Sequence, residues 1–256
     1  MNILAIGDVV GGSGCRFLRE HLPAFKRLKG VDLVVCNGEN AADGNGITPA
    51  AADHLFTSGV DVVTTGNHAF RRKEVYPAFD SEPFLLRPAN FPPGTPGKGY
   101  CIIDKGPVQV CVINLMGTVY LDNLDCPFRT MDRILPETTE AKITIVDFHA
   151  EATGEKRALG FYLDGRVSAV FGTHTHVQTA DETILPKGTG YLTDAGMTGP
   201  IQSVLGVAPA LAIEKMKGKL PVRFENAPPP CMLNGVLFEI DDKTGRALSV
   251  ERVKLM

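Results

Sequence analysis

The sequence lacks a long apolar run and a strong charge bias, and each absence excludes a class of protein. No stretch approaches the roughly 18 consecutive apolar residues that a membrane-spanning helix needs. The first ten residues carry Asp8 and have neither a basic start nor a small-residue cleavage site. We therefore expect a strand there and not a signal peptide. The net charge of −3 gives no basic footprint for nucleic acid or for an anionic membrane.

The six cysteines contain no Cys-x-x-Cys pair. Cys36 and Cys111 lie inside apolar runs that read as strands. This spacing favours buried free thiols over a disulfide framework or a zinc knuckle. We therefore expect a reducing, cytoplasmic location.

The common nucleotide-binding fingerprints are also missing. Gly11 and Gly12 follow the first strand closely, but the G-x-G-x-x-G register and the Gly-Lys-Ser/Thr signature do not occur there. The Rossmann and P-loop classes are excluded on residue type. Asp8, which ends this first strand, would by itself be read as a turn or capping residue.

The first part of the sequence alternates between strand and helix patterns. With 256 residues and 44% hydrophobic content, the chain is long enough to close as one domain over residues 1–256. In the first eighty residues we expect strands over 2–7, 31–37 and 60–65, and helices over 13–28, 48–59 and 72–79. This alternation predicts an α/β fold with parallel strands joined by crossover helices.

The pattern changes after residue 80. The elements expected there are a proline-rich loop over 88–99, a hairpin of 100–104 with 108–114, a long connection over 116–136, strands over 143–149 and 167–171 with a helix over 155–163 between them, and a final hairpin of 235–240 with 247–253. A connection as long as 116–136 is usually functional or mobile in a compact domain.

Metal-binding side chains stand at the exits of the apolar runs. Because loops leave the carboxyl edge of an α/β sheet together, side chains at these exits converge there. The candidates are Asp8, Glu39, Asn40, Asn67, His68, His149, His174 and His176. So many exits of this kind predict one metal site assembled from distant segments.

The strongest local signal is Gly172-Thr173-His174-Thr175-His176. Two histidines at i and i+2 point the same way on an extended chain, and imidazoles suit zinc, iron or manganese. Glu39 lies between Gly38 and Asn40, and its carboxylate could bridge two cations. A lone strand-end histidine such as His149 is more often a hydrogen-bonded structural residue.

The ordered set of motifs resembles the calcineurin-like metallophosphoesterases, and most closely the YmdB-like branch of bacterial dinuclear phosphodiesterases. The chain departs from the superfamily at Val10, where a histidine is usual, and at Glu39-Asn40, where an aspartate usually bridges the metals. At both positions the chain resembles the YmdB-like branch. The resemblance implies an α/β fold built as a four-layer α/β/β/α sandwich of two mixed sheets.

The resemblance also implies the residues of a dinuclear site. One metal would be held by Asp8, Glu39, Asn40 and His176, and the other by Glu39, Asn67, His149 and His174. The two ions would be divalent or trivalent, with iron, manganese and zinc all suited to these ligands. A metal-bridging hydroxide would attack the phosphorus in line, and His68, left without a metal, would act as the acid. The substrates implied are small phosphodiesters, with 2′,3′-cyclic nucleotides foremost.

Two alternatives to this function remain open. One is a phosphomonoesterase or nucleotidase, and the other is a regulatory, RNA-associated protein whose hydrolysis is incidental. His68 favours an enzyme, because a structural metal site needs no unligated acid. The only basic pair near the candidate ligands is Arg71-Arg72, which favours a singly charged diester over a dianionic monoester. The sequence leaves open a nucleotide or an RNA end as the substrate, and a homo-oligomer.

Overall fold

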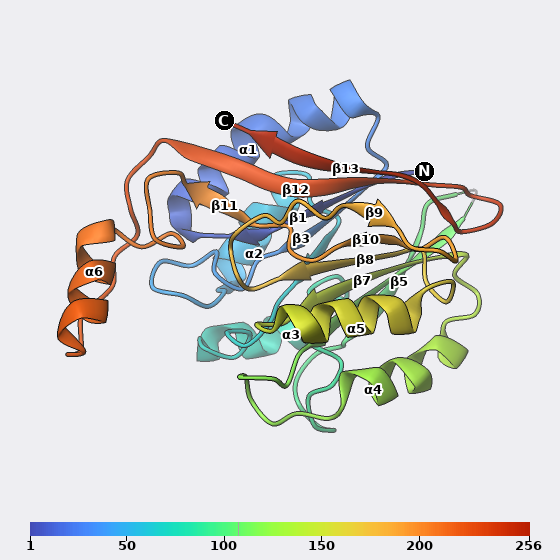
Figure 1. Ribbon diagram of the computed structural model, residues 1–256, viewed down its shortest axis with the longest axis horizontal. Helices are drawn as coiled ribbons and strands as arrows, with labels where there is room; N and C mark the ends of the chain where they lie inside the picture. Colours follow the sequence, from blue (N-terminus) through green and yellow to red (C-terminus); the bar gives the residue numbers. More distant parts are fainter. Residues whose placement is uncertain (107) are drawn as a thin grey trace.

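The computed structural model describes residues 1–106 and 108–256, which form two mixed β-sheets with helices against them (Figure 1). The strands are β1 (Asn2–Ile6), β2 (Asp8–Val9), β3 (Leu33–Asn37), β4 (Val62–Thr64), β5 (Tyr100–Asp104), β6 (Gln109–Met116), β7 (Ile143–His149), β8 (Ala169–Thr173), β9 (Thr183–Ile184), β10 (Gly190–Leu192), β11 (Met197–Pro200), β12 (Cys231–Ile240) and β13 (Ala247–Leu255). The helices are α1 (Gly11–Lys29), α2 (Pro49–Thr57), α3 (Tyr76–Ser81), α4 (Pro127–Ile134), α5 (Thr153–Leu163) and α6 (Pro209–Gly218), with short 3-10 turns η1 (Lys73–Val75) and η2 (Leu135–Glu137).

The first sheet confirms the predicted parallel strands at the start of the chain. Its order is β2-β11-β12-β1-β3-β4, with β13 also paired to β12. Strands β1, β3 and β4 run parallel, whereas β12 is antiparallel to β1 and to β13. The predicted C-terminal hairpin is therefore present, and its first strand begins earlier than expected, at Cys231.

The second sheet has the order β5-β6-β7-β8-β10-β9. Strands β5 and β6 form the expected hairpin, although Pro107 in its turn lies outside the described residues. Strands β6, β7, β8 and β10 are parallel to one another. Their carboxyl ends therefore share one edge of this sheet.

Three buried apolar clusters hold the sheets and helices together as layers. Alternate residues of β1 and β3, such as Ile3 and Val35, pack against residues of the second sheet, such as Val112 and Phe171. The opposite face of the first sheet packs against α1 and α2. The far face of the second sheet packs against α4 and α5, as Figure 1 shows below the strands. Strands buried on both faces explain the nearly continuous apolar runs in the sequence.

The ends of the first helices follow their sequence signals. Helix α1 ends at Lys29 with Gly30 as its C-cap, and the Thr48 hydroxyl accepts a hydrogen bond from the Ala51 amide at the start of α2. Proline at the first position of α2 loses no helical hydrogen bond. The short helix expected over 72–79 is split into η1 and α3.

The sequence predicts a long connection without regular structure over 116–136, but the structure has a helix there. Helix α4 occupies its end, with Pro127 at the first helical position and Met131 and Ile134 buried. Eight residues are too few for the apolar period to stand out in a sequence. The segment after His176 also holds β9, β10, β11 and α6, for which no expectation was made.

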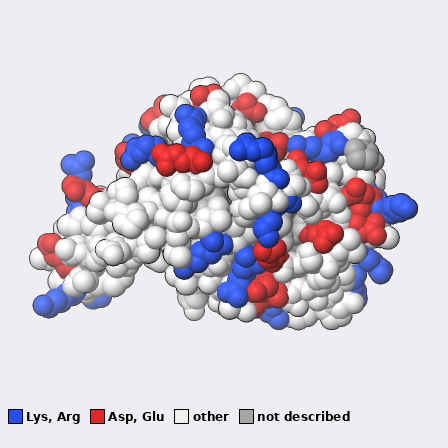
Figure 2. Space-filling model, turned by 90° about the horizontal axis from the view of Figure 1, so that it is seen from above, with Lys and Arg blue, Asp and Glu red and all other residues white. Residues whose placement is uncertain are grey.

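The surface agrees with the composition. Lysine and arginine side chains are interspersed with acidic ones on the face in Figure 2, and α6 forms the projection at its left. The cysteines Cys15, Cys36, Cys101, Cys111 and Cys231 are buried free thiols, and Cys126 is an exposed one. Within the described residues, no helix combines the length and the apolar character needed to span a membrane.

Candidate metal centre

The carboxyl ends of strands from both sheets bring all eight candidate residues into one chain of contacts. Asp8 begins β2 directly after β1, while Glu39 and Asn40 follow β3 and Asn67 and His68 follow β4. From the second sheet, His149 ends β7, and His174 and His176 follow β8. The site therefore lies where the edges of the two sheets meet.

Glu39 is at the centre of this cluster and is fully buried. Its Oε1 lies 3.2 Å from Nε2 of His149 and 3.3 Å from Nδ1 of His68. Its Oε2 accepts a hydrogen bond of 2.8 Å from the backbone amide of His68. One carboxylate thus faces imidazoles that come from two different sheets.

His149 joins a second group of ligand atoms. Its Nε2 is 2.9 Å from Oδ1 of Asn67 and 3.0 Å from Nδ1 of His174. Atoms of Glu39, His149 and His174 lie within 4.8 Å of one another. Gly66 permits this approach, because a Cβ there would lie 2.1 Å from the His149 ring.

Asp8 connects the first strand to both C-terminal histidines. Its Oδ2 accepts a hydrogen bond of 3.0 Å from the backbone amide of His174, and its Oδ1 lies 3.6 Å from Nε2 of His176. Oδ1 is buried and has no hydrogen-bond partner among the described residues. A buried carboxylate oxygen without a donor is costly, and a cation would satisfy it.

Asn40 is oriented differently from a ligand. Its Nδ2 faces Oε1 of Glu39 and Nε2 of His176, each at 3.3 Å, whereas its Oδ1 lies 3.0 Å from Nδ1 of His68. An amide binds a metal through its oxygen, so Asn40 would join the ligands only after its amide rotates by half a turn. In the present orientation Asn40 positions His68.

The electrostatics of the cluster favour positive charge. Burial opposes the charge on His149, but Glu39, Asp8 and Asp147 more than offset it and raise the pKa of His149 to about 9. Burial would likewise raise the pKa of Glu39, yet His149 and His68 hold it well below the usual value. Among the described residues, neither Lys nor Arg forms a salt bridge with Asp8 or Glu39. The carboxylates are therefore balanced by histidines alone.

The donor set fits metal ions. Bonds of about 2.1 Å at tetrahedral or octahedral angles place neighbouring ligand atoms about 3.0–3.4 Å apart. The contacts of His149 Nε2 with Glu39 and His174 fall at 3.2 and 3.0 Å. Carboxylate, amide and imidazole groups together suit iron, manganese and zinc.

Comparisons with known proteins now assign the family. Residues 4–253 match the family described as YmdB-like protein. The chain belongs to the YmdB-like family. It is 48% identical to a 2′,3′-cyclic-nucleotide 2′-phosphodiesterase of Bacillus subtilis strain 168, over 99% of this chain and 96% of that protein.

Two solved structures are similar to this chain over its whole length. A hypothetical protein from Thermus thermophilus is 42% identical with a TM-score of 0.94, covering 100% of this chain and 99% of that one. A novel phosphatase from Mycoplasma pneumoniae is 32% identical with a TM-score of 0.94, covering 100% and 93%. The sequence-based resemblance to the YmdB-like branch and the prediction of an enzyme, a phosphoric ester hydrolase, are confirmed.

Several residues of this YmdB-like site were missed by the sequence reasoning. The Thr173 hydroxyl donates to Oδ1 of Asp147 at 2.8 Å and lies 2.9 Å from Nδ1 of His149. Since the threonine gives its one hydrogen to Asp147, Nδ1 of His149 donates to the threonine, and in the neutral ring Nε2 carries the lone pair that faces the cluster. Oε2 of Glu151 lies 3.0 Å from Nε2 of His174 and orients that ring. Thr173 lies inside the Gly172–His176 motif, and Asp147 and Glu151 lie two residues on either side of His149, and these positions were the available signal.

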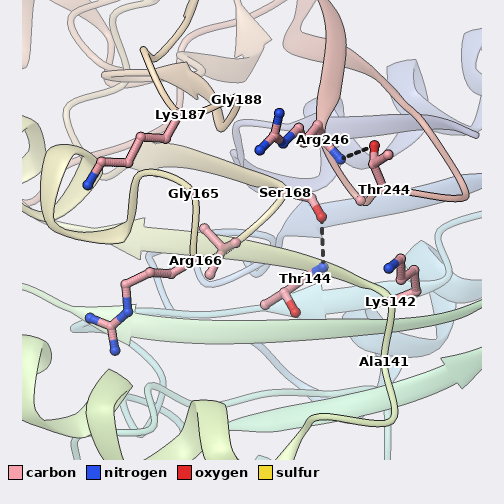
Figure 3. Close-up of a pocket in the computed structure, with 12 residues that line it drawn as sticks. Ala141, Lys142, Thr144, Gly165, Arg166, Ser168, Lys187, Gly188, Thr244 and Arg246 are labelled. Atoms are coloured by element: carbon pink, nitrogen blue, oxygen red, sulfur yellow. Dashed lines mark hydrogen bonds between the residues drawn. The ribbon is translucent and has the colours of Figure 1, made fainter.

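A polar cavity of about 290 Å³ lies at the other edge of the second sheet, around the amino ends of β7, β8 and β10. Ser168 and Thr144 stand in its middle, joined by a hydrogen bond from the Thr144 amide to the Ser168 hydroxyl. Lys187 and Arg166 extend to one side and Lys142 lies on the other (Figure 3). The cations on these two sides do not converge, and none of the described residues that line this cavity carries a carboxylate, so the cluster around Glu39 is the better candidate site.

Proposed function

We propose that this chain hydrolyses small phosphodiesters, with 2′,3′-cyclic nucleotides as the substrate class, at a centre that holds two divalent or trivalent metal ions. The Bacillus subtilis relative, whose name gives that substrate, supports the class at 48% identity over nearly the whole chain. The proposed ligands are Asp8, Glu39, Asn40 and His176 for one ion, and Glu39, Asn67, His149 and His174 for the other.

The observation that carries the proposal is the place of Glu39 between two groups of ligands. Its Oε1 meets His149, which contacts Asn67 and His174. The same Oε1 accepts a hydrogen bond from Asn40, whose amide nitrogen also reaches His176. A buried carboxylate shared in this way is suited to bridge two cations.

When bound, the two ions would supply positive charge for the phosphoryl oxygens and acidify a water molecule for attack. The chain itself supplies the proton. Nδ1 of His68 lies beside Asn40 and Glu39, so its Nε2 is left to face a substrate, and the ring is 27% exposed. From there His68 can protonate the departing ester oxygen.

The structure also bears on the choice between diester and monoester. Arg72 donates to the backbone carbonyls of Asp43 and Asn45 and so holds that loop. The aliphatic stem of Arg71 packs near Gly46. Of this pair, the guanidinium of Arg72 is thus engaged by loop carbonyls, so Arg71 alone would be left to balance the second charge of a dianionic monoester. This favours a singly charged diester over the nucleotidase alternative.

The test compares the two ester types on the purified protein with added Mn²⁺. We expect faster hydrolysis of 2′,3′-cyclic mononucleotides than of 3′- or 5′-monophosphates at equal concentration, with little discrimination among bases. The Glu39→Gln variant is the control for contaminating activity. A clear preference for monophosphates would favour a nucleotidase, and no turnover of either ester would favour the regulatory, RNA-associated alternative.

We further propose that residues 1–256 form a single domain with a four-layer α/β/β/α arrangement, which the packing of the outer helices against the two sheets supports. The six free thiols support a cytoplasmic location.

A further inference from the structure

The segment that carries His174 and His176 has an unusual backbone. Both residues have a positive φ, 98° for His174 and 64° for His176. Residues other than glycine rarely adopt this conformation, because Cβ then crowds the following carbonyl. Such a conformation persists only where the surrounding structure holds it in place.

A buried ion pair lies directly beneath this segment. Nζ of Lys156, on α5, donates to Oδ2 of Asp194 at 2.6 Å, and the side chains are 2% and 1% exposed. The aliphatic part of Lys156 passes against Gly172, where a Cβ would lie 3.0 Å from its Cδ and Cε. The lysine therefore reaches the segment through a space that only glycine leaves open.

The ion pair holds the peptide groups on both sides of His174. Nζ of Lys156 also donates to the backbone carbonyl of Thr173 at 2.8 Å. Oδ2 of Asp194 accepts hydrogen bonds from the Thr175 amide at 3.2 Å and from the Thr175 hydroxyl at 2.6 Å. The peptide before His174 and the peptide after it are thus fixed by one pair of charges, which restricts φ and ψ of His174.

A purely structural role explains this arrangement less well. Replacing a buried ion pair by neutral side chains is often neutral or stabilising, so stability alone gives little reason for the pair. Here both charges are directed at backbone groups beside the two histidines.

We propose that Lys156 and Asp194 are positioning residues. They hold His174, and His176 through Thr175, in the strained conformation that presents both imidazoles to the cluster. This inference rests on the proposed function in one respect, because it assumes that the imidazoles bind metal.

The first test follows the backbone in metal-free protein by hydrogen exchange and mass spectrometry. In Lys156→Met we expect faster exchange of the amides of residues 173–177, with little change in β1 and β3. The matched control is Leu159→Ala, which removes a buried side chain from the same helix without touching the segment. Unchanged exchange at 173–177 in Lys156→Met would overturn the inference whether or not the protein binds metal.

The second test separates positioning from stability by Mn²⁺ binding and thermal melting. We expect Lys156→Met to lower Mn²⁺ affinity by about 10–100-fold, the usual effect of losing a partner behind a metal ligand. The charge-neutral double variant Lys156→Met/Asp194→Asn should recover part of the melting temperature but not the affinity, because the Thr173 carbonyl still lacks its donor. Leu159→Ala should lower the melting temperature and leave the affinity unchanged.

The outcomes distinguish this inference from the proposed function. Affinity that recovers in the double variant together with stability would overturn the positioning role. If the unaltered protein binds no Mn²⁺, Fe²⁺ or Zn²⁺, the proposed function fails, and the hydrogen exchange of residues 173–177 still decides whether the ion pair holds the segment.

Discussion

Oε1 of Glu39 lies 3.2 Å from Nε2 of His149, although Glu39 follows a strand of the first sheet and His149 ends a strand of the second. This contact joins the two halves of the candidate centre. It also makes Glu39 the residue whose loss should affect both proposed ions, since its Oε1 meets side chains from both groups of ligands, His149 and Asn40.

The first prediction therefore concerns metal stoichiometry. Glu39→Ala should reduce bound metal from about two ions per chain toward none, because both sites lose a ligand and the anionic charge between them. Asn40→Ala should lose less, since its amide nitrogen now faces Glu39 and His176. Elemental analysis of protein purified without chelator measures this, with the exposed Glu20→Ala as control. Two tightly held ions in Glu39→Ala would show that the bridging assignment is wrong.

The second prediction separates metal binding from proton transfer. His68→Ala should keep the metal and lose rate on 2′,3′-cyclic nucleotides by roughly 10²–10⁴-fold, the usual range for one positioned acid. The loss should shrink for a nitrophenyl diester, whose leaving group needs little protonation. Steady-state rates on both substrates measure it, and His21→Ala on α1 is the matched control. Equal losses on both substrates would leave His68 only an electrostatic role.

The third prediction concerns Gly66, which leaves room for the His149 ring. In Gly66→Ala the new Cβ would lie 2.1 Å from Cδ2 of His149, so the backbone or the ring must move. We expect the free energy of unfolding to fall by about 1–3 kcal/mol, as for other overpacked sites, and Mn²⁺ affinity to fall with it. In the control Gly154→Ala, on α5, the Cβ meets nothing within 4 Å, and a gain of about 0.5–1 kcal/mol is expected. Thermal melting and Mn²⁺ titration of both variants give the comparison.

The fourth prediction concerns protons and metal. In metal-free protein the pKa of His149 is raised to about 9, so at neutral pH its ring is protonated. A metal ligand must be neutral imidazole, and binding at pH 7 should therefore expel a proton. Apparent affinity should rise with pH, by roughly tenfold per unit for one displaced proton, and level off above about pH 9. Calorimetry in buffers of different ionisation enthalpy measures the proton release, and an affinity independent of pH from 6 to 8 would contradict it.

The alternation of strands and helices near the amino terminus was predictable because local signals repeat there. Buried runs such as Leu33–Asn37 are almost wholly apolar, and Thr48-Pro49 marks the start of a helix. The candidate metal ligands were predictable from the same pattern, because each lies where an apolar, strand-like segment ends. Helix α4 was missed, since its eight residues make only about two turns and lie in a long connection, too short a window for a sequence pattern to be recognised.

The sequence by itself determined which residues could bind a metal, because ligand chemistry is a property of the side chain and strand ends are marked by where apolar runs stop. Only the tertiary structure decided which of them meet. The packing of two sheets brings Glu39 beside His149, and a lysine on α5 with an aspartate after β10 holds the backbone of His174. These contacts join residues far apart in the chain. They depend on strand pairing and burial that no local pattern encodes, so the roles of Lys156 and Asp194 emerge only in the folded molecule.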